Sequence, residues 1–156
     1  MRRVTPVELA NLCLIYDEDS VLVQEKQGTG GLVFPGGHVE NGESVLESVI
    51  REVREETGLL IRKPELCGIK DWCEEDGTRY LVMLYKTNQF EGNLRSSQEG
   101  RVFWLKRNDM DTANLIWNMR ELMEIFEGSS YSEFFIRTTE GSYQKELLGE
   151  TVTIVQ

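Results

Sequence analysis

One segment of this sequence carries the complete start and stop signals of an α-helix, and it constrains the fold more than any other. Ser44 can cap the first turn with Glu47 as its capping-box partner, and Gly58 stands where a left-handed residue commonly ends a helix. A short apolar stretch at 32–34 and the turn residues Pro35-Gly36-Gly37 come before it. The sequence therefore predicts a strand, a glycine turn and a helix in direct succession.

Most of the remaining chain has the pattern of β-strands. Strands are predicted at residues 9–16, 21–24, 66–72, 80–87 and 102–105. The first two are expected to form one hairpin, the next two are expected to form a second hairpin, and the strand at 102–105 has no hairpin partner. Apolar residues spaced i, i+3, i+4, i+7 predict a second helix over 118–126. The last thirty residues favour short strands or a C-terminal hairpin. We expect a mixed sheet of five or more strands in one domain spanning residues 1–156.

The charge balance limits the partners of the chain. Lysine and arginine total 17 against 27 aspartate and glutamate, a net charge of −10 at pH 7. This field disfavours binding to nucleic acid polymers or anionic membranes. No apolar run approaches the ~20 residues of a membrane span, and the N-terminus lacks the apolar segment of a secretory signal. The three cysteines contain no CxxC pair, which fits a reducing cytoplasm.

The predicted helix presents two faces. At 100° per residue, an apolar stripe runs along Leu46, Val49, Ile50 and Val53. Glu52, Glu55 and Glu56 lie one turn apart on another face, so their carboxylates can converge. Such a cluster is either a solvated acidic face, partly neutralised by neighbouring arginines, or a site for hard divalent cations. The helix alone leaves both interpretations open.

The wider segment decides between them. Residues 37–59 match every specified position of G-x5-E-x7-R-E-U-x-E-E-x-G-U, where U is aliphatic. This string resembles the Nudix box, and a chance match has a probability on the order of one in ten million. The resemblance implies an α/β (α+β) fold, the Nudix-type α/β/α sandwich with a mixed β-sheet between helices. It also implies hydrolysis of a nucleoside diphosphate linked to a group X, with Mg²⁺ or Mn²⁺ as cofactor.

The resemblance assigns the metal ligands to Glu52, Glu55, Glu56 and the backbone carbonyl of Gly37. Gly36 and Gly37 allow the backbone to approach a phosphate or metal without a side chain in the way. Arg51 is expected to orient Glu43 or Glu52 through a forked hydrogen bond.

The general base has two candidates. Family members place it either on the box glutamate equivalent to Glu52 or on a glutamate of a later loop, which Glu99 resembles; that loop glutamate would also serve as a metal ligand. The alternative for Glu99 is a solvated loop carboxylate. His38 occupies a position where triphosphate-hydrolysing members often have lysine, so it either contacts phosphate or is an ordinary loop residue.

Trp117 and Asn118 open the second helix, where triphosphate-hydrolysing relatives carry base-contacting residues. Trp117 could stack on a base, and Asn118 could offer a donor and an acceptor to a purine edge. The alternative for Trp117 is an aromatic anchor in the core.

We therefore expect a MutT-like enzyme that removes pyrophosphate from a nucleoside triphosphate, with oxidised purines such as 8-oxo-dGTP among its substrates. After Pro64 the chain has no proline, so it lacks the downstream proline typical of the ADP-ribose subgroup. ADP-ribose or another nucleotide sugar is the enzymatic alternative, and a non-catalytic nucleotide sensor or partner-binding module is the other. A small-molecule nucleotide is the expected partner, and the protein is expected to be a monomer or homodimer.

Overall fold

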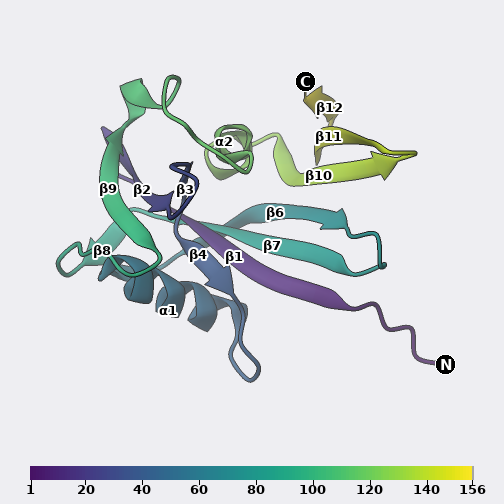
Figure 1. Cartoon of the computed structure of the whole chain (residues 1–156), viewed down its shortest axis with the longest axis horizontal. Helices are drawn as coiled ribbons and strands as arrows, with labels where there is room; N and C mark the ends of the chain where they lie inside the picture. The colour runs from purple at the N-terminus through teal and green to yellow at the C-terminus, as the bar shows by residue number, and fades with distance from the viewer. Residues whose placement is uncertain (156) are drawn as a thin grey trace.

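The computed structural model describes residues 1–155 and is built around a seven-stranded sheet (Figure 1). Its strands in spatial order are β12 (Val152–Val155), β11 (Ser142–Gly149), β10 (Tyr131–Thr139), β6 (Glu65–Cys73), β7 (Arg79–Thr87), β1 (Val7–Ile15) and β4 (Gly36–His38). The pairs β1–β7 and β6–β10 are parallel and the others antiparallel. The predicted mixed sheet is thus confirmed.

Two smaller sheets complete the strands. One contains β3 (Leu32–Val33), β2 (Ser20–Lys26) and β9 (Gly100–Lys106), and the other β5 (Leu60–Arg62) and β8 (Gln89–Glu91). A short 3₁₀ turn covers Arg107–Asp109.

The first predicted hairpin is wrong in its pairing, although both strands exist. β1 and β2 lie in different sheets and share only the isolated bridge between Tyr16 and Val21. Each strand finds a longer partner elsewhere: β1 pairs along its whole length with β7, and β2 pairs along its whole length with β9. The second predicted hairpin, β6–β7, is confirmed.

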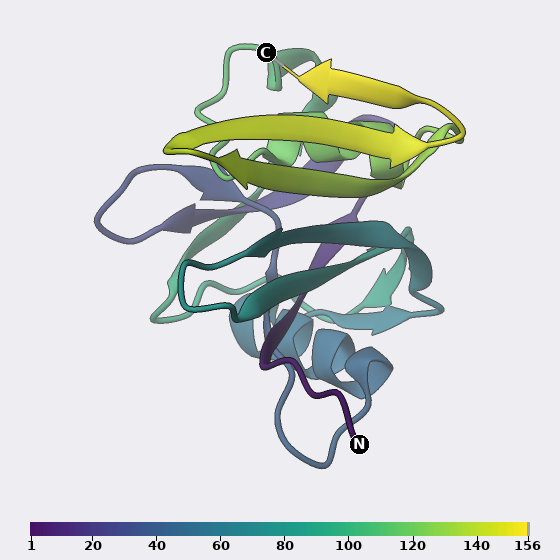
Figure 2. The same ribbon diagram turned by 90° about the vertical axis from the view of Figure 1, so that its right-hand side faces the viewer.

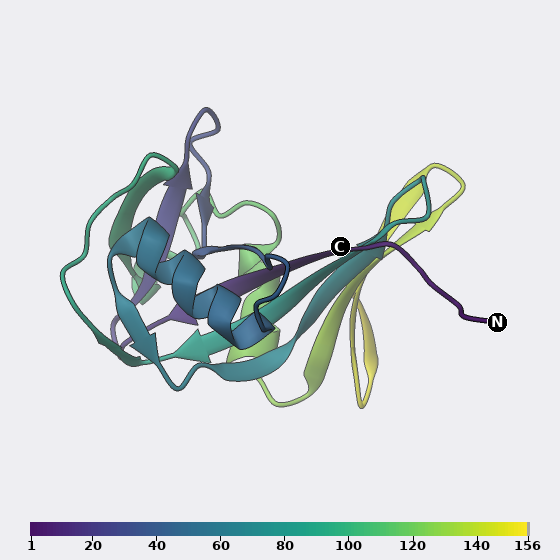
Figure 3. The same cartoon turned by 90° about the horizontal axis from the view of Figure 1, so that it is seen from below.

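The two α-helices cover opposite faces of the large sheet. Alternate residues of β1 show this, because Leu14 packs into the core under α2 (Met119–Phe126), whereas Cys13 and Ile15 pack under α1 (Val45–Thr57). Figure 3 shows α1 crossing in front of the strands. The sheet between helices agrees with the expected sandwich. Within residues 1–155, neither helix has the length and apolar character needed to cross a membrane.

The ends of α1 follow the sequence signals. The Ser44 hydroxyl accepts a hydrogen bond from the Glu47 amide, and the Glu47 carboxylate accepts one from the Ser44 amide. Gly58 adopts φ 81°, and its amide donates to the Arg54 carbonyl. Leu46 departs from the predicted apolar stripe, since it is 45% exposed.

The C-terminal residues form the meander β10–β11–β12, stacked beyond β6 in Figure 2. The predicted strands are confirmed, and their attachment to the central sheet through β10 is a finding of the structure. Phe134 of β10 is fully buried, so the meander contributes to the core under α2.

Candidate active site

A cavity of about 720 Å³ opens over one face of the seven-stranded sheet. Toward the β4 edge it is lined by Gly36, Gly37, Glu52, Glu56 and Glu99. Toward the β10 edge the lining residues are Lys70, Trp72, Tyr80, Val82 and Ile136, and Trp117, Asn118 and Lys26 also border it. The structure therefore brings most of the predicted site residues to one cavity.

The three glutamates of α1 have different environments. Glu56 is 2% exposed and the Glu52 side chain 14% exposed, and both line the cavity. The Glu55 side chain is 59% exposed and accepts a hydrogen bond from Arg51 at 3.2 Å instead. The acidic face expected from the helical wheel is thus divided, since Glu56 stands at the border of the buried stripe.

Arg51 ties the loop before α1 to the helix. Its guanidinium donates two hydrogen bonds to Glu43, at 2.7 and 3.0 Å, and a third to the His38 carbonyl. It also donates to Glu52 at 3.1 Å. The Arg51 hydrogen bond holds the pKa of Glu43 at about 2. This is the orienting geometry that the sequence suggested for Arg51.

Glu56 lies under the backbone of β4. One carboxylate oxygen accepts a hydrogen bond from the Gly36 amide at 3.2 Å. The other, Oε1, has no hydrogen-bond partner among the described residues although it is buried. Burial, and then the neighbouring Glu99 carboxylate, raises the pKa of Glu56 to about 9. Two carboxyl groups so close together require a proton or a cation between them.

The Gly37 backbone packs directly against a carboxylate. Its amide donates to the Asn11 side chain at 3.2 Å, and any Cβ at this position would collide with the Glu52 carboxylate. Asn11 is itself fixed by a hydrogen bond to Ser48 of α1 at 2.8 Å. A side chain at residue 37 would therefore displace the Glu52 carboxylate from its position beside β4.

These residues fit a hard divalent cation. The unpartnered oxygen of Glu56, the close approach of Gly37 to Glu52 and the all-oxygen donor set match what Mg²⁺ and Mn²⁺ prefer. As the side chains lie, no three acidic, histidine or cysteine groups within residues 1–155 form a ready coordination cluster. Arg51 contacts two of the α1 glutamates, and the exposed Glu55 must rotate to join the other two.

Trp117 and Asn118 border the cavity as two consecutive residues in the left-handed region, with φ 57° and 65°. The Trp117 ring is not packed as a core anchor, because the residue is 55% exposed and the Lys26 ammonium lies 5.5 Å from its centroid. Asn118 is the N-cap of α2 but makes no side-chain capping bond. Its amide therefore remains available to a ligand.

His38 is exposed at the cavity rim. Its ring contacts the Tyr80 hydroxyl at 3.2 Å and Glu8 at 3.5 Å. These contacts fix His38 on β1 and β7, and they place it beside the glycines of β4.

Several cavity residues were not predicted from the sequence: Asn11, Lys26, Lys70, Trp72 and Tyr80. The alternation of Lys70 and Trp72 on β6 was the available signal, since residues two apart share a face of a strand. A lysine in a strand ordinarily indicates a solvent-facing position, however. Here α2 and the segment before it cover this face of β6, and β10 extends the sheet beside it.

Comparison with known proteins agrees with this geometry. The NUDIX domain model matches residues 7–126. The chain belongs to the Nudix family and is a hydrolase that acts on nucleoside diphosphate derivatives.

Individual relatives show the same relationship. The chain is 36% identical over 112 residues to the uncharacterized Nudix hydrolase YvcI of Bacillus subtilis, covering 69% of this chain and 71% of that protein. It is 30% identical to an ADP-ribose pyrophosphatase of Methanocaldococcus jannaschii, over 54% of this chain and about half (52%) of that relative. The crystal structure of the MutT protein of Bacillus halodurans is 26% identical with a TM-score of 0.73, covering 94% of this chain and 97% of that one.

Proposed function

We propose that this Nudix hydrolase is a divalent-cation-dependent pyrophosphohydrolase of nucleoside triphosphates, which releases the monophosphate and pyrophosphate and accepts oxidised purines such as 8-oxo-dGTP. One observation carries the proposal: a single cavity joins Glu52, Glu56 and Glu99 to Trp117 and Asn118. A polyphosphate at the carboxylates would then place its base near the aromatic residue. The similarity to a MutT protein supports this assignment.

The acidic end of the cavity supports cation dependence. Glu52, Glu55, Glu56, Glu99 and the Gly37 carbonyl would hold Mg²⁺ or Mn²⁺. The bound cation would neutralise the phosphate oxygens and lower the pKa of the attacking water. Arg51 keeps Glu52 in place, and the Gly36 amide keeps Glu56 in place.

The proton of the attacking water goes to Glu52 or Glu99 in this proposal. Burial raises the pKa of Glu52, which makes its carboxylate a stronger base toward the attacking water. Glu99 stands on the exposed loop before β9 and reaches the same cavity.

A second candidate substrate is ADP-ribose or another nucleotide sugar. The similarity to an ADP-ribose pyrophosphatase favours it. A nucleotide-binding module without turnover is the non-enzymatic alternative for the same cavity.

A substrate panel tests the proposal. The protein is incubated with Mg²⁺ and dNTPs, 8-oxo-dGTP, ADP-ribose and dinucleoside polyphosphates. The nucleotide products are separated by ion-exchange chromatography and released pyrophosphate is measured, so that AMP formed from ADP-ribose is detected as well as pyrophosphate formed from a triphosphate. We expect pyrophosphate from the triphosphates and no turnover in EDTA. Preferential cleavage of ADP-ribose would identify nucleotide sugars, and not nucleoside triphosphates, as the substrate class. Turnover in EDTA would refute the cation requirement. Binding without turnover of any compound would indicate the non-enzymatic module.

A further inference from the structure

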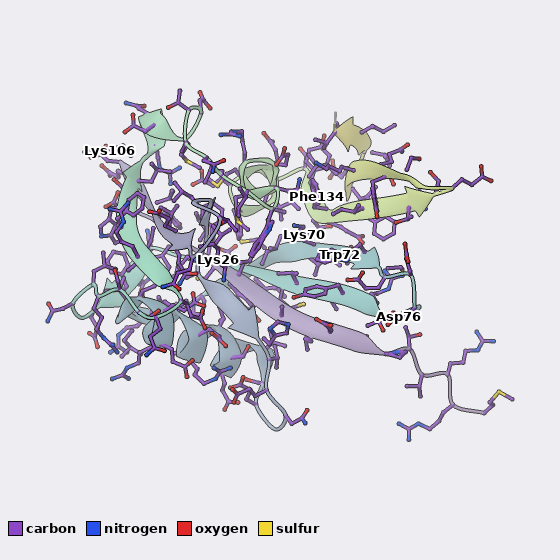
Figure 4. The ribbon with its side chains drawn as sticks, in the orientation of Figure 1. Lys26, Lys70, Trp72, Asp76, Lys106 and Phe134 are labelled. Atoms are coloured by element: carbon purple, nitrogen blue, oxygen red, sulfur yellow. The ribbon has the colours of Figure 1, made fainter. Side chains whose placement is uncertain are left out.

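Lys70 is a buried cation on the inner face of β6. It is 6% exposed and lines the cavity together with Trp72, two residues along the same strand (Figure 4). Its ammonium lies 5.4 Å from the centroid of the Trp72 ring. The only hydrogen bond of this ammonium within residues 1–155 goes to the Trp117 carbonyl, at 2.8 Å, and none of the ion pairs there includes Lys70.

An ammonium has three donors and no acceptor. One donor is used by Trp117, so two remain in a cavity whose nearby walls are mostly apolar, formed by Trp72, Val82 and Ile136. Unused donors at a buried position favour any ligand group that brings an acceptor to them. A ligand group that brings a donor would leave both sides unsatisfied.

The surroundings of Lys70 lie partly outside the residues matched by the family model. The match ends at residue 126, whereas Ile136 and the neighbouring Phe134 belong to β10. Phe134 is in register with Lys70, and Ile136 with Trp72. This wall of the cavity is therefore built by the C-terminal meander together with β6.

The hydrogen bond to Trp117 connects this wall to the residues proposed to contact the base. Trp117 and Asn118 both have positive φ, a conformation that costs free energy for residues other than glycine. Lys70 holds the carbonyl of that strained turn, so its remaining donors lie next to the base-contacting segment.

We propose that Lys70 is a specificity-determining residue, which donates to a ring carbonyl of the substrate and so selects keto bases over amino bases. Guanine and hypoxanthine present acceptors at O6 and N7, whereas adenine presents an N6 amino donor beside N7. A lysine contact of this kind discriminates between bases by about 5- to 150-fold. This inference rests on the proposed function in one respect: it requires that a nucleobase binds in this cavity.

The test measures binding, which requires no turnover. Dissociation constants for dGMP, dIMP and dAMP are determined by titration calorimetry for the wild-type protein, Lys70→Met and Lys70→Arg. We expect the wild type to bind dGMP and dIMP at least about 5-fold more tightly than dAMP, consistent with the lower end of lysine-to-purine discrimination. Lys70→Met should bring the ratio close to one, and Lys70→Arg should keep it because arginine is also donor-only.

Two further variants complete the design. Lys86→Met, a half-buried lysine of β7 that does not line the cavity, should keep the wild-type ratio. Lys70→Gln offers a donor and an acceptor, so it should relax the preference toward dAMP even if Lys70→Met fails to fold. Equal binding of the three nucleotides by the wild type, or an unchanged ratio in Lys70→Met or Lys70→Gln, would overturn the inference. If the wild type hydrolyses no triphosphate but still prefers dGMP and dIMP over dAMP, the proposed function is refuted and the role of Lys70 in base selection is not.

Discussion

Adjacent residues of α1 have opposite environments. Glu55 is exposed and paired with Arg51, whereas Glu56 is buried against Gly36 with one oxygen unpartnered. Burying the Glu56 carboxylate lowers the free energy of unfolding. An apolar residue at the border of the stripe would pack there without this penalty, so packing of α1 does not require a carboxylate. Function is the simplest reason to keep a carboxylate at this position.

Glu52 and Glu99 can be separated by their kinetic effects. If Glu99 accepts the proton of the attacking water, Glu99→Gln should lower kcat by orders of magnitude with little change in metal affinity. Glu52→Gln should change both, since Glu52 packs against Gly37 and Arg51. Measuring kcat across a Mg²⁺ titration distinguishes them, and a mild effect at Glu99 would make it an ordinary loop carboxylate.

Trp117 should govern substrate affinity more than stability. Base stacking on an aromatic ring contributes about 1–3 kcal/mol, so Trp117→Ala should raise KM by roughly 5- to 150-fold. The free energy of unfolding should change by roughly 0.5 kcal/mol, because the residue is 55% exposed. Trp104→Ala is the control, since Trp104 packs against Phe90 and should lower stability with KM unchanged. The reverse pattern in the two variants would assign Trp117 to packing.

Lys70 predicts a pH dependence of stability. Burial, partly offset by Glu121 of α2 and reinforced by Lys145 of β11, lowers the pKa of Lys70 from 10.5 to about 8. Between these values the unfolded chain binds more protons than the folded one, so folding becomes more favourable as pH rises. The wild type should therefore gain up to about 3 kcal/mol relative to Lys70→Met from pH 8 to 10.5. Urea unfolding at several pH values measures this, and a constant difference would contradict it.

Among the secondary-structure elements, α1 holds the acidic residues of the site in fixed positions. Ser44→Ala removes one half of the capping box and should destabilise the protein by about 1 kcal/mol, or roughly 2–4 °C in Tm. Ser44 does not line the cavity, so kcat should stay unchanged. Ser129→Ala, at an exposed serine after α2, is the control and should leave Tm as it is. A large loss of kcat in Ser44→Ala would show that the cap also positions the carboxylates.

The sequence predicted α1 well because its signals are local. Ser44, Glu47 and Gly58 act within a few residues of one another, and the box glutamates follow from the same segment. The pairing of β1 with β7 and of β6 with β10 could not be read in this way, since it depends on residues far apart in the chain. Lys70 was missed for that reason, because its burial is decided by β10 and α2.

At the scale of the whole molecule, the meander belongs to the core. Phe134 is fully buried under α2, so Phe134→Ala should destabilise the protein by about 3–5 kcal/mol. Phe135, the next residue, is only half-buried on the opposite face, and Phe135→Ala should cost clearly less. Chemical denaturation of both variants tests this. Equal, small losses would mean that the meander is an accessory to a core complete at residue 126.

The parallel strand pairs also set the order in which the chain can assemble. Val7 pairs with Arg79, and Ile69 pairs with Glu133, so β1 and β6 each wait for about 60 or more further residues before they find their parallel partners, although β1 can pair with β4 earlier. Such distant pairing slows folding, because the entropy of closing the loop is lost before the contacts form. The wall around Lys70 includes Ile136 of β10, so it cannot form before β10 has been synthesised. The acidic end of the cavity can therefore form on a nascent chain earlier than the end proposed to select the base.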